Sequence, residues 1–101
     1  MAQRVIPRIV WTDSAWQELD DAASFIARVS PRYAATLTDE ARSAARSLRK
    51  FPRRGRMVPE IGDETIREIF VKSYRLIYEI RELEIVVLAF LHGARRFPGS
   101  G

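Results

Sequence analysis

Arginines recur along the C-terminal half of the chain, and their side chains could hold an anion. Arg67 and Arg75 fall in segments where apolar residues alternate, and Arg95 follows a long apolar segment. A guanidinium is a planar fork of donors that fits a phosphate or a carboxylate with two hydrogen bonds. If the segments pair in one sheet, these arginines could line a concavity that binds nucleic-acid phosphates or an acidic protein segment. The alternative is a ladder of ion pairs with Glu68 and Glu79, which stabilises little where it is exposed.

His92 is the one histidine of the sequence, and it ends the most apolar segment. An imidazole can act as a general acid or base near neutral pH. The alternative is a structural histidine at a strand end. With no second histidine and no cysteine, the sequence offers no metal site and implies no cofactor. The thirteen carboxylates are scattered without a catalytic pair, and only Glu60, in a loop, stands out.

A basic cluster occupies the middle of the chain, with five cations within eight residues: Arg49, Lys50, Arg53, Arg54 and Arg56. Such crowding is repulsive unless an anion is near, so the cluster predicts a patch that contacts phosphates. The alternative is a solvated helix end, where cations complement the helix dipole.

The composition also favours an anionic partner. Net charge is +4, and fifteen of the seventeen basic residues are arginine. A genome rich in G and C, whose codons favour arginine and alanine, would give the same bias. Only the positions of the arginines in the chain can distinguish this explanation from an anionic partner. The length of 101 residues indicates one domain, which we expect at residues 1–98 before a flexible tail at 99–101. The N-terminus has no features of a secretory signal and no apolar run could span a bilayer, so we expect a cytoplasmic protein without a membrane partner.

The N-terminal residues predict a strand followed by a helix. Arg4 to Trp11 is rich in valine and isoleucine, and Pro7 places this strand at an edge or a bulge. Apolar residues from Ala15 to Ile26 then follow helical spacing. Thr12, Asp13 and Ser14 are candidates for the N-cap of this helix, and Ser14 with Gln17 fits a capping box.

A second helix follows at once. Ser30–Pro31 supplies a capping serine and a proline in the first turn, and Phe51–Pro52 ends the helix. The short connection predicts an antiparallel helical hairpin. Arg53 to Thr65, with two glycines and a proline, predicts a loop.

The remaining residues predict three strands, the first two from a period of two and the third because it is apolar nearly throughout, as in a central strand. Ile66–Val71, Tyr74–Ile80 and Glu84–His92 should form an antiparallel meander. Arg75 alternates with Tyr74, so it should lie on the open face of the sheet if the tyrosine row is buried. The order β-α-α-β-β-β predicts an α+β fold, with the helical hairpin on one face of a small antiparallel sheet.

Several short motifs occur in a particular order along these predicted helices and strands. They are Trp11 before a capped helix, Ser30-Pro31, Leu48-x-x-Phe51-Pro52, Gly55-Arg56-x-Val58-Pro59-Glu60, Arg67-Glu68, Tyr74-Arg75-x-x-Tyr78 and His92-Gly93-Ala94-Arg95. No single motif is specific, but their order and spacing resemble the RelE/ParE toxin superfamily, and more closely its ParE branch. The resemblance covers about Val5 to Phe97.

The resemblance implies a toxin of a type II toxin–antitoxin system. Its partner would be a ParD-like antitoxin, which wraps the toxin with a partly disordered helical segment in a heteromeric complex. ParE-type members inhibit DNA gyrase, whereas RelE-type members cut mRNA on the ribosome. The residues that we assign to target binding or toxicity are Arg56, Glu60, Arg67, Arg75, His92 and Arg95.

The two branches make different demands on these residues. RNA cleavage by attack of the 2′-hydroxyl needs a base, an acid and cations on the phosphate. Arg75 and Arg95 match positions that bear on toxicity in the nuclease branch, and His92 would complete a catalytic set. Only Phe97 is aromatic beyond His92, and it cannot donate a proton. Val58-Pro59-Glu60 and His92-Gly93-Ala94-Arg95 resemble the ParE branch more, so the resemblance implies a non-enzymatic gyrase inhibitor. The alternatives are a ribosome-dependent endoribonuclease and a degenerate member that binds only its antitoxin or DNA.

Overall fold

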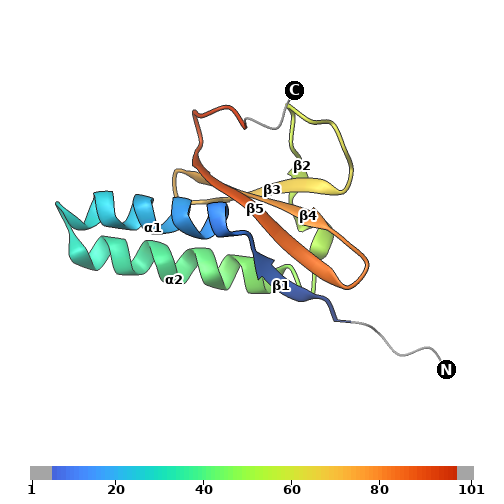
Figure 1. The fold of residues 1–101 in the computed structure, drawn as a ribbon, viewed down its shortest axis with the longest axis horizontal. Helices are drawn as coiled ribbons and strands as arrows, with labels where there is room; N and C mark the ends of the chain where they lie inside the picture. The colour runs from blue at the N-terminus through green and yellow to red at the C-terminus, as the bar shows by residue number, and fades with distance from the viewer. Residues whose placement is uncertain (1–5, 98–101) are drawn as a thin grey trace.

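The computed structural model describes residues 6–97, which form a helical hairpin and a five-stranded sheet (Figure 1). The elements are β1 (Arg8–Trp11), α1 (Asp13–Ala27), α2 (Pro31–Ser47), a 3-10 turn (Pro52–Arg54), β2 (Arg56–Met57), β3 (Ile66–Val71), β4 (Tyr74–Ile80) and β5 (Glu84–His92). Their order across the sheet is β1-β5-β4-β3-β2. This arrangement confirms the predicted α+β fold. The tail expected at residues 99–101 lies outside the described residues.

The direction of β1 differs from the one predicted, because the sequence predicted a wholly antiparallel sheet. Strands β2 to β5 pair antiparallel, but β1 pairs parallel with β5, with Arg8 opposite Glu84 and Trp11 opposite Val87. The sheet is therefore mixed. β1 lies at an edge, as Pro7 predicted, and begins directly after that proline, which lacks a backbone donor. The first residues of the predicted strand, 4 and 5, lie outside the described part of the chain.

Both helices begin at a capping side chain. The Thr12 backbone N–H bonds to the carbonyl of Val87, which keeps Thr12 extended, and its Oγ1 accepts from the backbone N–H of Ala15 at 3.0 Å. The predicted capping box was therefore wrong, because Ser14 lies inside α1. The start of α2 is as predicted, with Ser30 Oγ accepting from the backbone N–H of Tyr33 at 3.2 Å.

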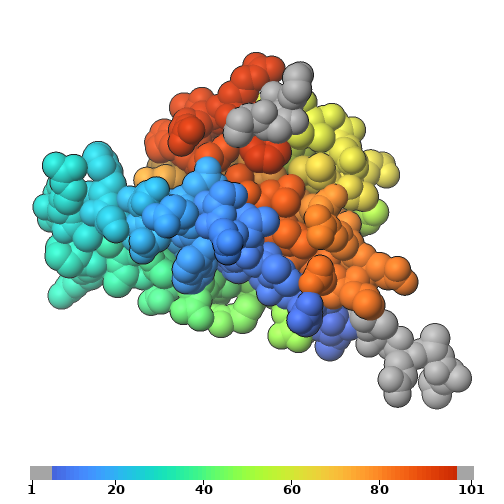
Figure 2. Space-filling view, in the orientation of Figure 1, coloured from blue at the N-terminus to red at the C-terminus, as the bar shows by residue number. Residues whose placement is uncertain are grey.

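The main core lies between the hairpin and one face of the sheet. Alanines on α2 let the two helices pack closely, and larger side chains fill the space above the strands. The fully buried members include Ala15, Leu19, Leu37, Ala41, Leu48, Leu76, Tyr78, Ile85 and Val87. The far end of the hairpin projects beyond the sheet (cyan in Figures 1 and 2), where Phe25, Val29 and Tyr33 are exposed.

A second, smaller core covers the opposite face of the sheet. Val58, Ile77, Ala89 and Leu91 are buried there, and Phe97 packs against them. Figure 1 shows the loop after β2 and the segment after β5 on the same side of the molecule. The segment 53–65 was expected to be only a loop, but it contains the 3-10 turn and the two-residue strand β2. Among residues 6–97, no helix is both long enough and apolar enough to cross a membrane.

Candidate functional site

Arg75 lies at the centre of the second sheet face. It points away from the row of Tyr74, Leu76 and Tyr78, as the alternation predicted. The face is not open, however, because the loop after β2 and residues 93–97 cover it. Arg75 is only 5% exposed. The predicted open concavity is therefore wrong, and the arginine is part of a buried ion cluster.

Two carboxylates hold the Arg75 guanidinium. Its Nη1 and Nη2 each donate to one oxygen of Glu60 at 2.8 Å. Its Nε donates to Glu68 Oε1 at 2.8 Å, and its Nη2 lies 2.6 Å from the same oxygen. Its Nη1 also donates to the carbonyl of Arg95 at 2.9 Å. We call Arg56, Glu60, Glu68 and Arg75 the buried ion cluster.

Arg56 completes the buried ion cluster from β2. Its Nε donates to Glu68 Oε2 at 2.6 Å, and its guanidinium lies 5.5 Å from the ring centre of Phe70. Glu68 has no exposed side-chain area and is matched by two arginines. The charges of two arginines and two carboxylates balance. Glu68 and Arg75 are buried, where an unpaired charge is costly, whereas the Arg56 side chain is 62% exposed and meets the cluster from the solvent side.

The buried ion cluster also fixes the segment that follows β5. The backbone N–H of Phe97 donates to Glu60 Oε2 at 3.0 Å. The hydrogen bonds from Arg75 and from Phe97 lower the pKa of Glu60 from 4.5 to about 2. The carboxylates in turn raise the pKa of Arg75 above its ordinary value, with Glu60 as the main cause. Both groups are therefore charged at neutral pH.

Arg67 does not join Arg75. It lies on the other face of β3 with Ile69, and its Nη1 donates to the carbonyl of Gly55 at 2.8 Å. The side chain of Arg95 is exposed, and only its carbonyl meets the buried ion cluster. The predicted concavity lined by Arg67, Arg75 and Arg95 is thus not formed, because strand alternation sends Arg67 and Arg75 to opposite faces.

His92 and Arg95 share a hollow of about 230 Å³ beside α1, together with Glu18 and Tyr74. His92 is exposed, its Nδ1 accepts from the backbone N–H of Ala94 at 3.3 Å, and its ring meets Tyr74 edge-on. Because this hollow lies on the helix side of the sheet, the suggested catalytic set of Arg75, Arg95 and His92 is not brought together.

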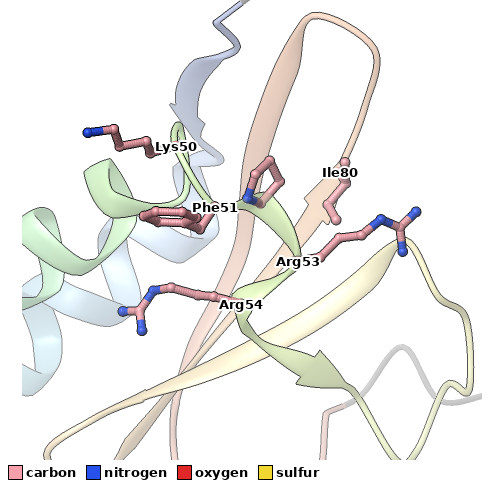
Figure 3. A pocket seen from close by; sticks show the side chains of 6 residues that line it. Lys50, Phe51, Arg53, Arg54 and Ile80 are labelled. Carbon is pink, nitrogen blue, oxygen red and sulfur yellow. The ribbon is translucent and has the colours of Figure 1, made fainter.

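The basic cluster of residues 49–56 spreads in several directions. Arg49 donates to the carbonyl of Pro7 at 3.3 Å, Arg54 donates to Ser47 Oγ at 2.9 Å, and Arg56 belongs to the buried ion cluster. Figure 3 shows Arg53 and Arg54 pointing to opposite sides. The five cations therefore do not converge on one phosphate.

The alternative of an arginine–glutamate ladder is confirmed for Glu68, which pairs with Arg75, but the burial of this pair was not predicted. The Lys72–Ser73 connection was the available signal for this pairing. It sets a register in which Glu68 lies opposite Ile77, diagonal to Arg75. The other proposed ladder partner, Glu79, pairs with Arg81 instead. No group of three or more metal-binding side chains lies together within residues 6–97.

The helical hairpin and the mixed sheet together define an α+β fold. A solved structure described as the chromosomal ParDE TA system from P. aeruginosa has the same fold, with a TM-score of 0.70 and 16% identity over 86% of this chain and 96% of that chain. Residues 9–97 match the family described as ParE toxin of type II toxin-antitoxin system, parDE, and the chain belongs to this family. No curated protein sequence matches the chain.

Proposed function

We propose that this ParE-family toxin acts by binding, as an inhibitor of DNA gyrase, and that a ParD-like antitoxin neutralises it. The observation that carries the proposal is the state of Arg75. A guanidinium has five N–H groups. Four hydrogen bonds, to Glu60, Glu68 and the Arg95 carbonyl, involve all three nitrogens, and Nη2 also lies 2.6 Å from Glu68 Oε1 in an ion pair. Arg75 is therefore buried and held by two carboxylates, so it is not available to grip the phosphate that RNA cleavage would require.

The separation of the other candidate groups supports the same proposal. A general acid or base must lie within hydrogen-bond reach of the reacting group that the cations hold. His92 lies on the helix side of the sheet and Arg75 on the other side. The arrangement favours a protein-binding toxin over an endoribonuclease. Gyrase is the target that the resemblance to the ParE branch implies, and a cytoplasmic location goes with it.

The exposed apolar surface of the hairpin supports an antitoxin partner. Phe25 is 67% exposed, Val29 91% and Tyr33 45%, all near the α1–α2 connection. Trp16 is 48% exposed as well, but it lies at the start of α1 against Trp11, away from this group. Exposed apolar side chains that lie together mark interaction sites, and an amphipathic helix is the kind of partner that covers them.

A supercoiling assay with purified gyrase tests the proposed target. We expect the full-length toxin to inhibit supercoiling and to stabilise DNA cleavage complexes. Intact supercoiling at saturating toxin would contradict the proposal. Cuts in mRNA at the ribosomal A site in a translation extract would favour the endoribonuclease. Unaffected growth on expression without antitoxin would favour the degenerate member.

A further inference from the structure

Positive charge is concentrated in one stretch of the chain. Residues 41–59 contain seven cations and no carboxylate: Arg42, Arg46, Arg49, Lys50, Arg53, Arg54 and Arg56. By contrast α1, Asp13–Ala27, contains four carboxylates and no cation. The end of α2 and the 3-10 turn therefore form a basic region, whereas the first helix is acidic.

A hollow with an apolar lining lies in this basic region. It has a volume of about 520 Å³ and is lined by Lys50, Phe51, Pro52, Arg53, Arg54 and Ile80 (Figure 3). Phe51 is 61% exposed and contributes an aromatic face. The basic residues contribute their aliphatic stems to the walls while their charged ends reach the rim. The hollow thus combines an apolar floor with a positively charged rim.

The charge on this rim is not compensated. Within residues 6–97, the side chains of Lys50 and Arg53 form no ion pair and no hydrogen bond, and Arg54 bonds only to the neutral hydroxyl of Ser47. The nearest carboxylate along β4, Glu79, pairs with Arg81. An uncompensated positive rim attracts an anionic partner.

We propose that this hollow, the Phe51 hollow, binds an acidic protein segment that inserts one apolar side chain. Apolar hollows with a charged rim are places where protein partners can seat anchor side chains. Arg53 and Arg54 point to opposite sides of the Phe51 hollow, so they would meet carboxylates before and after the anchor residue. A nucleic-acid backbone would need cations aligned along one path, and these diverge. The inference does not depend on gyrase as the target.

Selection from a displayed library of random 12-residue peptides on the full-length chain tests the Phe51 hollow. We expect the enriched peptides to carry aspartate and glutamate on both sides of a leucine, isoleucine, phenylalanine or tryptophan. Fluorescence polarisation with one enriched peptide should show a Kd at least tenfold higher for Phe51→Ala and for Arg53→Glu. Higher salt should weaken binding to the unchanged chain.

Arg32→Glu is the matched control, because Arg32 is an exposed cation in the first turn of α2, at the opposite end of that helix. Its Kd should stay within twofold of the parent, and circular dichroism should show that all variants fold. Enriched peptides without acidic residues, or equal binding by Phe51→Ala, would overturn the proposal. Displacement of the peptide by a 20-base single-stranded RNA or a 20-base-pair DNA duplex that binds more tightly would assign the hollow to nucleic acid. Gyrase inhibition is measured separately, so its absence with peptide binding intact would count only against the proposed function.

Discussion

Arg75 is the residue at which the geometry is most demanding, because one guanidinium serves two carboxylates and a carbonyl at once. A lysine keeps the charge but offers a point charge instead of a planar fork. We expect Arg75→Lys to lower the free energy of unfolding by about 2 kcal/mol or more, since it leaves buried acceptors unmatched. Urea unfolding followed by circular dichroism measures this loss.

Arg81→Lys is the control for that substitution. Arg81 pairs with Glu79 at 2.8 Å, but its side chain is 53% exposed. An exposed pair stabilises by about 1 kcal/mol at most, so this variant should unfold almost like the parent. Equal losses in the free energy of unfolding for the two variants would show that the buried ion cluster stabilises the fold no more than an exposed ion pair does.

Glu60 makes a prediction about pH. Its pKa is about 2 in the fold, against an ordinary value of 4.5. A lowered carboxyl pKa stabilises the fold above pH 4.5, and this contribution is lost as the pH falls toward 2. Glu60→Gln removes the charge and one acceptor, so it should cost about 1–2 kcal/mol at pH 7. The difference from the parent should shrink steadily between pH 4.5 and 2 in urea unfolding. A difference that stays constant over this range would contradict the assignment.

At the residue scale, the sequence predicted which face of the sheet Arg75 occupies but not which residues surround it. Alternation correctly placed Arg75 opposite the tyrosine row, and Glu60 stood out as a loop carboxylate. That the two meet depends on how the loop after β2 folds onto the sheet. This packing involves Val58 and Phe97, which are distant in sequence, and no local pattern encodes it.

At the scale of elements, the connection from the 3-10 turn to β2 passes close to β3 and β4. The backbone N–H of Gly55 donates to Tyr78 Oη at 3.1 Å, and that hydroxyl donates to the carbonyl of Pro52 at 2.6 Å. Burial raises the pKa of Tyr78, which keeps this hydroxyl protonated as a donor. A Cβ at position 55 would lie 2.5 Å from the carbonyl oxygen of Glu68.

Gly55→Ala should therefore push the turn away from β3. We expect a loss of about 2 kcal/mol in the free energy of unfolding, in the range of overpacked cores. Gly93→Ala is the comparison, because its Cβ would lie 3.1 Å from the Ser73 carbonyl oxygen and needs only a small shift. The midpoint of thermal unfolding should be lower for Gly55→Ala than for Gly93→Ala. The reverse order would contradict the close approach of Gly55 to β3.

The elements that sequence predicted well are those with a long repeat of apolar positions. Both helices and strands β3 to β5 follow such repeats. β2 has only two residues, Arg56 and Met57, too few to show alternation. The direction of β1 depends on its pairing with β5 across the sheet, and the four residues Arg8–Trp11 carry no signal for it.

At the scale of the whole molecule, the surface presents regions of different chemistry. The tip of the hairpin exposes apolar side chains, and the end of α2 exposes cations around the Phe51 hollow. The two regions lie at opposite ends of α2, which spans 17 residues. At about 1.5 Å per residue they are some 25 Å apart, far enough for two partners or for two segments of one partner.

The hairpin tip yields a prediction about the antitoxin. We expect the antitoxin partner to bind through the exposed Phe25, so Phe25→Asp should raise the Kd at least tenfold in calorimetric titration. The fold should survive, since Phe25 is 67% exposed. Leu83→Asp is the matched control, because Leu83 is 59% exposed in the β4–β5 turn, away from the hairpin. Antitoxin binding that weakens equally in both variants would mean that the partner does not dock on the hairpin, and an unchanged Kd for Phe25→Asp would move the docking surface elsewhere.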